Sequence, residues 1–321
     1  MITNRTPTVL DLTTVDLPST TLGPLAGVRH AHVRDRLWRA LHHKRWYYFS
    51  VADSATFLGC SIVDLGYLCK GFVYLVDRPA RRMLIHRQSL LPGGPWCRVE
   101  RSASGPSGAR FRSPTLGLRF TREASGAFSL KGSARGLRFS LVLAPSGEPI
   151  VAANTLPTAA TSATEKGLAY HVRGNIEAAG RRFDMQNAFG GSDFTDGYLP
   201  RHTLWRWANV SAAVAGHDFG LNLVQGYMGA CECVALVDGE VTSLGEGIID
   251  RPANPMDHWR VRTACHRVDL KFAPVAMHED ATDLGVIHAK FHQPIGTYSG
   301  RVLDLAIEDA LGVCEDQDVL W

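Results

Sequence analysis

Cysteines are few in this 321-residue sequence, and they form no paired pattern. There are seven, an odd number, and no CxxC pair occurs among them. This arrangement excludes a secreted disulfide framework and a ribbon-type zinc site, so we expect reduced thiols. The closest two, Cys231 and Cys233, would point to the same side of a strand. Small apolar packing is the favoured interpretation of this pair, ahead of metal binding or redox chemistry.

Long apolar runs and strong charge are also missing. No stretch approaches the roughly 18 uninterrupted apolar residues of a membrane-spanning helix, and the opening segment lacks the basic and then apolar pattern of a signal peptide. We therefore expect a cytoplasmic protein without membrane insertion. The formal net charge of +3 is small for this length, and the basic residues are dispersed along the chain. We expect neither nucleic acid nor an anionic membrane as a partner, and the sequence indicates no particular oligomeric state.

The familiar catalytic motifs are absent as well. The sequence has no P-loop, no GxGxxG after a strand, no GxSxG elbow and no HExxH. Two histidine pairs, His30 with His32 and His288 with His292, would each share one face of a strand. Zinc takes three or four ligands, and no carboxylate or cysteine stands at a familiar spacing from these histidines. The sequence therefore predicts neither a cofactor nor a metal site.

Short β-rich runs dominate the chain. Helical periodicity is scarce; in "HVRDRLWRALHHK", Val33, Leu37 and Leu41 would share a face beside Trp38, which predicts one short helix before Lys44. Almost every later segment alternates apolar and polar residues between Gly, Pro, Ser and Asp. A spacing of about 8–12 residues per strand and turn is typical of antiparallel barrels or sandwiches. It excludes a parallel nucleotide-binding fold.

The two halves of the chain resemble each other. A shift of 161 residues aligns "FLGCSIVDLGYLCKGFVYLVD" with "DFGLNLVQGYMGACECVALVD" without a gap. A tryptophan-led strand precedes each copy, with Trp46 in one and Trp205 and Trp207 in the other. We infer an internal duplication that gives two related β units, residues 1–150 and 151–321, joined in "APSGEPIVAANTLPTAATSAT". The predicted fold class is therefore all-β.

Polar residues recur at matched places within the aligned strands. Ser61 aligns with Asn222 on one face, and Asp64 aligns with Gln225 on the other. If these places face a barrel interior, they would line a pocket. If they face solvent, they carry no functional information.

Several blocks of the sequence resemble a bacterial protein family known as domain of unknown function 2804. They span nearly the whole chain and read "RWYYFSV", "TEK" at residues 164–166, "DFTDGYLPRHTLWRWA", "GLNLVQG", "ALVDG", "HWRVRT", "RVDLKF", "GVIHAKFHQPIGTYSG" and "GVCEDQDVLW". More distantly, the family is similar to paired lipocalin-like proteins that include carotenoid 1,2-hydratases and natural-product cyclases. That resemblance implies two calycin-type antiparallel β-barrels and a hydrophobic ligand. A shared fold does not by itself transfer an activity.

Charged and aromatic side chains are concentrated in the segment from Gly190 to Val210. Glycines supply turn conformations there, and Asp193 and Asp196 can bond backbone N–H groups in such turns, which is a structural explanation for both acids. The following strand places Trp205 and Trp207 on one face, opposite His202 and Arg206. A pair of indole rings must be shielded from water, so that face belongs to the core or to an aromatic pocket wall. Core packing is the favoured interpretation.

Glu232 is the more informative acid. It stands between two cysteines and before "VALV", where a carboxylate must be paired or must have a raised pKa. A carboxyl group with a raised pKa suits a general acid that works near neutrality. The alternative is a buried salt bridge, with Lys166, Arg201 or Arg206 as its partner.

Two functional hypotheses follow. The first is a cofactor-independent acid/base isomerase, hydratase or cyclase that holds a small apolar or amphipathic metabolite in a β-barrel pocket, with Trp46, Tyr48, Trp205 or Trp207 facing a developing cation. Its candidate catalytic residues are Asp193, Glu232, His202 and Tyr198. Its candidate ligand-binding residues are Trp46, Tyr48, Asp64, Lys166, Arg201, Trp205, Trp207, Asn222 and Gln225. The second hypothesis is a non-catalytic lipid or metabolite binder that uses the same cavity; in a third interpretation these residues only fasten the two barrels together.

Overall fold

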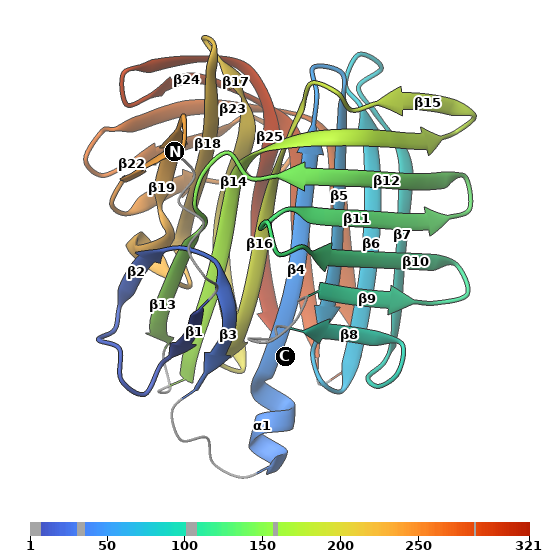
Figure 1. The fold of residues 1–321 in the computed structure, drawn as a ribbon, viewed down its shortest axis with the longest axis vertical. Coiled ribbons are helices and arrows are strands. Elements are labelled where there is room, and N and C mark those ends of the chain that lie inside the picture. Colours follow the sequence, from blue (N-terminus) through green and yellow to red (C-terminus); the bar gives the residue numbers. More distant parts are fainter. Residues whose placement is uncertain (1–7, 31–35, 101–107, 157–159, 286) are drawn as a thin grey trace.

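The computed structural model describes residues 8–30, 36–100, 108–156, 160–285 and 287–321, and Figure 1 shows that strands make up almost all of them. The described residues contain one α-helix, α1 (Arg36–His42), and one 3₁₀ turn, η2 (Gly229–Glu232). The predicted all-β class and the predicted short N-terminal helix are confirmed. Val33, which the apolar spacing places on one face of that helix, lies outside the described residues.

A sheet of 14 strands forms the first unit, in the order β7-β6-β5-β4-β16-β14-β12-β11-β10-β9-β8, with β2, β13 and β15 attached at its side. Its strands are β2 (Ser19–Leu22), β4 (His43–Ala52), β5 (Thr56–Asp64), β6 (Leu68–Asp77), β7 (Arg82–Pro92), β8 (Cys97–Glu100), β9 (Gly108–Arg112), β10 (Leu116–Arg122), β11 (Phe128–Ala134), β12 (Leu137–Ala144), β13 (Ile150–Leu156), β14 (Ala160–Ala178), β15 (Arg181–Asp184) and β16 (Ala188–Tyr198). Two N-terminal strands, β1 (Thr8–Asp11) and β3 (Leu25–Arg29), pair separately and in parallel.

A sheet of nine strands forms the second unit, in the order β20-β19-β18-β17-β25-β24-β23-β22-β21. Its strands are β17 (His202–Val214), β18 (His217–Gly226), β19 (Val234–Val237), β20 (Glu240–Ser243), β21 (Gly247–Asp250), β22 (Trp259–Thr263), β23 (Val268–Asp283), β24 (His288–Val302) and β25 (Leu305–Leu320).

The two sheets follow the same path. Each begins with a four-strand meander, β4 to β7 or β17 to β20, and in each the last long strand returns to pair with the first strand of the meander. The aligned sequence segments occupy equivalent places, because β5 corresponds to β18 and β6 to β19. The chain passes from one sheet to the other between β16 and β17. The predicted boundary between residues 150 and 151 stays a prediction.

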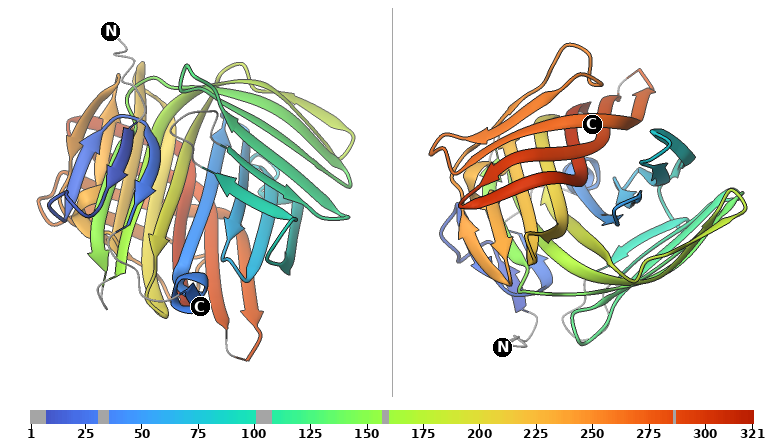
Figure 2. Two further views of the ribbon diagram at one scale, coloured as in Figure 1. Left: turned by 60° about the horizontal axis from the view of Figure 1, so that its bottom comes forward. Right: turned by 90° about the horizontal axis from the view of Figure 1, so that it is seen from above.

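Both faces of β4 are buried from Tyr47 to Ala52, which explains why the strand is almost entirely apolar after Arg45. Tyr47, Phe49 and Val51 point into the aromatic core of the first unit, whereas Tyr48 and Ala52 belong to the core of the second. In the end-on view of Figure 2, the medium-blue strands of the first sheet lie beside the red strands of the second sheet. The outer face of the first unit therefore closes the open side of the second.

A β-bulge in β14 sets the side-chain directions on which the site depends. The pairing of β14 with β16 shifts between Gly167 and Tyr170, and Ala169 takes a positive φ of 52°. Before the bulge, successive side chains alternate between the two units. Glu165 points into the first unit, where it meets Arg122, and Lys166 points toward the second.

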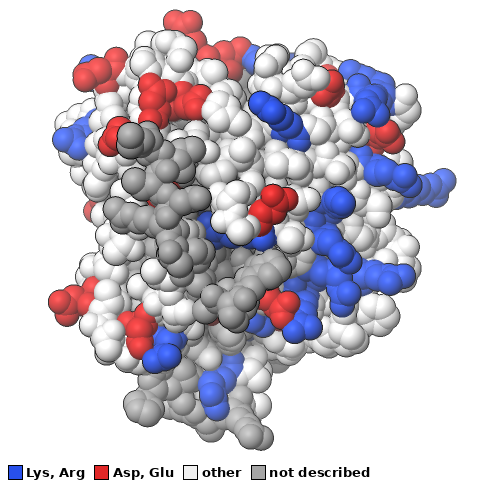
Figure 3. Space-filling model, viewed as in Figure 1, with Lys and Arg blue, Asp and Glu red and all other residues white. Residues whose placement is uncertain are grey.

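Register also gathers basic side chains on the outer face of the first sheet. Arg98, Arg110, Arg119 and Lys131 stand directly opposite one another across β8, β9, β10 and β11, and all four are exposed. Figure 3 shows the resulting concentration of Lys and Arg over these strands. Like charges in direct register are destabilising. Cations that are dispersed in the sequence thus share one face, while the predicted lack of an anionic partner stays a prediction. No helix in the described part of the chain is long and apolar enough to cross a membrane.

Candidate functional site

A pocket lies between the two units, inside the second half-barrel and beneath the outer face of the first. The cavity has a volume of about 160 Å³. The first unit contributes Trp46, Tyr48, Ser61, Val63, Leu65, Leu68, Lys70, Phe72, Leu90, Lys166 and Asp193 to its wall. The second unit contributes Trp205, Trp207, Val224, Tyr227, Glu232, Asp280, Thr282, Ile287, Ala289, Phe291, Gln293, Glu315, Gln317, Val319 and Trp321. The lining is mostly apolar, with a small number of polar groups that converge on one region, as is usual for small-molecule sites.

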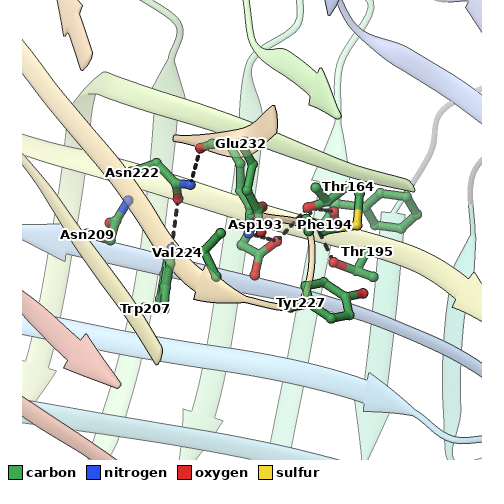
Figure 4. A network of polar contacts seen from close by, with 12 residues as sticks. Thr164, Asp193, Phe194, Thr195, Trp207, Asn209, Asn222, Val224, Tyr227 and Glu232 are labelled. Carbon is green, nitrogen blue, oxygen red and sulfur yellow. Dashed lines mark hydrogen bonds and ion pairs between the residues drawn. The ribbon is translucent and has the colours of Figure 1, made fainter. Parts of the chain in front are cut away.

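Lys166 and two carboxylates form an ionic cluster in this pocket. The Lys166 Nζ atom lies 2.8 Å from Asp193 Oδ1 and 3.2 Å from Glu232 Oε2. All three residues are buried. Asp193 also accepts hydrogen bonds from the Trp46 indole N–H at 3.1 Å and from the Thr164 hydroxyl at 3.2 Å. Figure 4 shows Glu232 and Asp193 close to each other in this network.

The charges of this cluster do not balance. Burial lowers the pKa of Lys166, but attraction to Asp193 and Glu232 outweighs burial and raises that pKa above the ordinary lysine value. Burial raises the pKa of Glu232; Lys166 opposes this increase, and Asp193 adds to it. Lys166 therefore stays an ammonium group. It lies between the two carboxylates and is the cation that pairs with both of them.

Glu315 on β25 is a third buried acid in the pocket. Its Oε1 accepts a hydrogen bond from the Trp205 indole N–H at 2.6 Å, and its Oε2 accepts one from the Gln293 amide at 2.7 Å. Burial raises the pKa of Glu315 to about 7, although the bonds from Trp205 and Gln293 lower it. Asp193 and Lys166 also influence this pKa, in opposite directions, so Glu315 and the ionic cluster form one electrostatic unit.

A chain of hydrogen bonds leads from Glu315 back to the first unit. The Tyr74 hydroxyl donates to Gln293 Oε1 at 2.6 Å and lies 3.0 Å from the Tyr48 hydroxyl. Gln293 in turn donates to Glu315, so the orientation of its amide is set from both sides. Burial raises the pKa of Tyr48 and of Tyr74 well above the ordinary tyrosine value. Both hydroxyls are therefore neutral and can relay a hydrogen bond but not hold a charge.

Three indoles surround these acids. Trp46 and Trp205 stack with ring centroids 6.1 Å apart, and Trp207 meets Tyr48 edge to face at 5.6 Å. The Trp207 N–H donates to Asn222 Oδ1 at 2.7 Å, and the Lys166 ammonium lies 5.4 Å from the Trp207 ring. Each indole N–H is thus fixed to a protein acceptor. The rings form a rigid aromatic wall.

The structure brings together most of the residues that the sequence singled out for the pocket. Lining it are Asp193, Glu232, Lys166, Trp46, Tyr48, Trp205 and Trp207. Asn222 stands behind Trp207, and its side-chain amide donates to the Glu232 backbone carbonyl at 2.7 Å. Of the three cations weighed as partners for Glu232, Lys166 is the one that reaches it.

Two of the predicted catalytic residues lie away from this pocket. His202 is exposed and pairs with Asp318 at 2.8 Å. Tyr198 packs against Trp38 and His43, with centroids 5.6 and 4.7 Å away, on the other face of β16 from Asp193. Side chains alternate between the two faces of a strand. His202 is an odd number of residues from Trp205 and Trp207, and Tyr198 is an odd number of residues from Asp193, so both point to the face opposite the pocket.

Asn222 and three further predicted ligand-binding residues are also outside the lining. Asp64 pairs with Arg45 at 2.9 Å, and Gln225 accepts a hydrogen bond from the Ile249 backbone N–H at 3.0 Å. Arg201 is exposed and does not line the pocket. The matched positions Asp64 and Gln225 therefore serve local structure at the edges of their strands, whereas Ser61 lines the pocket.

Sequence reasoning missed Glu315. Its sequence context resembles that of Glu232, because it follows the apolar run "LGVC" from Leu311 to Cys314. The same argument that singled out Glu232 would have indicated a paired or protonated acid here. Tyr74 and Gln293 gave no comparable signal, since a tyrosine or a glutamine within an alternating strand is ordinary.

Comparisons with known proteins agree with this architecture. A family model described as "Domain of unknown function (DUF2804)" matches residues 21–321. The solved structure of CghA with Sch210972 is similar at a TM-score of 0.56 and 11% identity, and covers 87% of this chain and 88% of its own. A Nitrosomonas europaea protein with the provisional name AttH has a TM-score of 0.58 and 14% identity, with 89% and 96% covered.

A kievitone hydratase from Nectria haematococca has a TM-score of 0.52 and 8% identity, with 88% and 90% of the two chains covered. Identities this low show a shared fold and nothing further. The predicted paired lipocalin-like architecture is confirmed. No curated protein sequence matches the chain.

Proposed function

This chain belongs to the DUF2804 family, and we propose that it is an enzyme that isomerises, hydrates or cyclises a small apolar or amphipathic molecule by acid/base chemistry. The observation that carries this proposal is Glu315, a buried carboxyl group with a pKa of about 7 in a mostly apolar pocket. Near neutral pH such a group holds a proton in about half of the molecules and can transfer it to a bound ligand. The same fold in a protein named as a hydratase is consistent with this role.

Glu315 is the proposed proton donor. Trp205 and Gln293 each donate to one of its oxygens, which leaves a lone pair on each oxygen for the transferable proton. When the proton moves to an alkene carbon or a carbonyl oxygen of the ligand, Glu315 becomes a carboxylate. The two hydrogen bonds then strengthen, because they are directed at a group that has gained negative charge.

Asp193 is the proposed proton acceptor. Lys166, Trp46 and Thr164 hold it through contacts with both of its oxygens. After protonation of the ligand, loss of a ligand proton to Asp193 completes an isomerisation or cyclisation; for hydration, the proton comes from the water that adds. One proton enters and one leaves, and exchange between the two carboxyl groups restores the starting state. Glu232 shares the Lys166 ammonium group with Asp193.

The tryptophan wall suits the charge that would develop during this reaction. A ligand that accepts a proton gains positive charge, and the faces of aromatic rings attract cations. Trp46, Trp205 and Trp207 surround the region between Glu315 and Lys166. The remaining wall is aliphatic, with Leu65 and Val319 among its members, which favours an apolar skeleton.

A solvent-isotope experiment tests the proposal while the substrate is still unidentified. Wild-type protein and Glu315→Gln are incubated in D₂O with a metabolite extract of the native organism, and new deuterated C–H products are sought by mass spectrometry. We expect wild type to form such a product and Glu315→Gln to form it at least about 100-fold more slowly. Asp318→Asn is the matched control, because Asp318 is an exposed acid on the same strand.

The pH profile adds a second criterion. Because the proton donor must be protonated, the rate should fall as pH rises through about 7. Equal rates for wild type and Glu315→Gln would contradict the proposed mechanism. Activity that rises through pH 7 would also contradict it.

A non-catalytic metabolite binder is the second candidate. It is favoured by the observation that Glu315, Gln293, Tyr74 and Tyr48 already satisfy one another without a ligand. In that case, a small molecule that copurifies with the protein would quench tryptophan fluorescence equally in wild type and Glu315→Gln, and neither protein would change it chemically.

A further inference from the structure

A second polar cluster lies on the face of β16 that points away from the pocket. It comprises His30, His43 and Asp196. The Nε2 atoms of His30 and His43 lie 3.0 and 2.7 Å from the same oxygen of Asp196, Oδ1. One ligand atom from each of the three residues falls within 4.8 Å of the others. The sequence gave only the neighbouring histidines as a signal, and His32 lies outside the described residues.

Three separate segments supply these side chains. His43 begins β4 and stands opposite Tyr198 on β16, which places it diagonally across from Asp196. His30 comes directly after β3, from the N-terminal part of the chain. The cluster therefore joins the N-terminal segment to the centre of the large sheet.

The orientation of both imidazoles is fixed by other groups. The Nδ1 atom of His30 lies 3.0 Å from the Thr161 hydroxyl. The Tyr198 ring stacks on His43 and meets His30 edge to face, with centroids 4.7 Å apart in each case. Histidines that bind metal ions usually have an outer hydrogen-bond partner of this kind on the second ring nitrogen, which directs the first toward the ion.

The arrangement at the centre of the cluster suits a cation. The Asp196 side chain is only 13% exposed, and two imidazole nitrogens are directed at one of its oxygens. Each nitrogen must carry a proton to donate to that oxygen, or both can share a metal ion with it.

Two imidazole nitrogens and a carboxylate are a common ligand set for divalent transition metals, with bonds of about 2.0–2.2 Å. Two ligand atoms bound tetrahedrally at about 2.1 Å are about 3.4 Å apart, so the two nitrogens, now 3.0 and 2.7 Å from Asp196 Oδ1, would each have to move away from that oxygen by less than about 1 Å. Only small movements would be needed to admit an ion. The His43 side chain is 28% exposed, which gives an ion a route from solvent.

We propose that His30, His43 and Asp196 form a binding site for a divalent first-row transition metal such as Zn²⁺. Water would complete the coordination shell. The site is independent of the proposed enzyme activity, because β16 separates it from the pocket. Its expected effect is structural: the ion would tie the segment around His30 to β4 and β16 and stabilise the folded chain.

The test is titration of metal-free protein with Zn²⁺ alone, measured by calorimetry, together with thermal unfolding with and without Zn²⁺. We expect one ion per chain and a melting temperature that rises with Zn²⁺ concentration. His43→Gln and Asp196→Asn should each weaken binding at least about 10-fold. Co²⁺ in place of Zn²⁺ should give visible absorption bands that both variants lack.

His171→Gln is the matched control, because His171 and Asp218 form a comparable pair at 2.7 Å, and within the described parts of the chain no third ligand completes a group with them. It should bind Zn²⁺ as wild type does. Absence of stoichiometric binding to wild type would overturn the proposal. Unchanged binding by His43→Gln would overturn it as well, and that variant should fold because its side chain is partly exposed.

Discussion

Glu165 and Lys166 are neighbours on β14, yet they belong to two very different buried clusters. Glu165 points into the first unit, where both of its oxygens accept hydrogen bonds from Arg122 at 3.0 and 3.1 Å. Lys166 points into the pocket, where it meets Asp193 and Glu232. The first cluster has one cation for one acid. The second has one cation for two acids, with Glu315 close enough to interact electrostatically.

If the proposed function holds, this difference separates a structural ion pair from one that takes part in the reaction. Arg122 and Glu165 cancel each other's charge next to an aromatic core that contributes no residue to the pocket. Removal of two charges from water costs free energy, and a matched pair recovers much of this cost. In the pocket one carboxyl group must remain without a cation of its own. Burial raises the pKa of such a group, as it does for Glu232 and Glu315, and a raised carboxyl pKa suits acid/base chemistry near neutral pH.

The largest effect should come from the balanced pair. We expect Glu165→Gln to lower the free energy of unfolding by about 3–5 kcal/mol, because it leaves the Arg122 guanidinium buried without a counter-charge. The loss should be the same at pH 6 and pH 8, since an arginine does not release its proton in this range. Urea unfolding measures it.

The control for that variant is Glu177→Gln, on the same strand, where an exposed pair with Arg182 at 3.4 Å should contribute little. A Glu165→Gln protein as stable as this control would contradict the structural role of the pair.

Removal of the cation from the unbalanced cluster should depend on pH. Lys166→Met should cost about 3–4 kcal/mol at pH 8, the lower part of the range for a broken buried pair, because Glu232, whose pKa is already raised by burial, can bind a proton. The loss should become smaller as pH falls from 8 to 5. Equal losses at both pH values would show that Glu232 does not take up a proton when the Lys166 charge is removed.

Glu315 should give the next effect, with a defined sign. Its pKa of about 7 in the folded protein is above the ordinary value of 4.5. The contribution of neutral Glu315 to stability is therefore complete below pH 4.5 and is lost as pH rises through about 7. A shift of this size corresponds to about 3 kcal/mol between the two limits.

Glu315→Gln carries no titrating proton, so this slope should disappear from its curve of unfolding free energy against pH. A slope that persists in the variant would assign the titration to another group. This measurement is independent of catalysis and can be made without a substrate.

The smallest effect is expected at the surface. His202 and Asp318 form an ion pair in which both side chains are 55% exposed. We expect His202→Ala to change the free energy of unfolding by less than about 0.5 kcal/mol. Turnover should also be unchanged. A strong loss of activity would show that His202 takes part in the reaction, although it does not line the pocket.

The sequence was sufficient to predict much of the fold. Alternation and turn spacing predicted the all-β class, and the aligned segments predicted two related β units, with which the common path of the two sheets agrees. The residues around Trp46 and Trp205 could be expected to face the same space because their strands correspond. These features depend on local periodicity, which a single sequence displays directly.

The site was less predictable because it depends on which face of a strand each side chain occupies and on contacts between strands that are distant in the sequence. The sequence could not tell which face of β16 meets the second unit, so Asp193 and Tyr198 were equally good candidates. The bulge at Gly167 and Tyr170 decides which way Glu165 and Lys166 point, and it has no clear sequence signature. Glu315 reaches the pocket only because β25 returns to pair with β17.

The opposite charges of Glu165 and Lys166 also guard the chain against misassembly. If β14 slid by a single residue during folding, Lys166 would enter the first core beside Arg122 and Glu165 would join the acids of the pocket. Both sides of the strand would then bury repelling charges at the same time. The two adjacent residues thus destabilise the wrong register of β14 in both units, and they do so without a ligand.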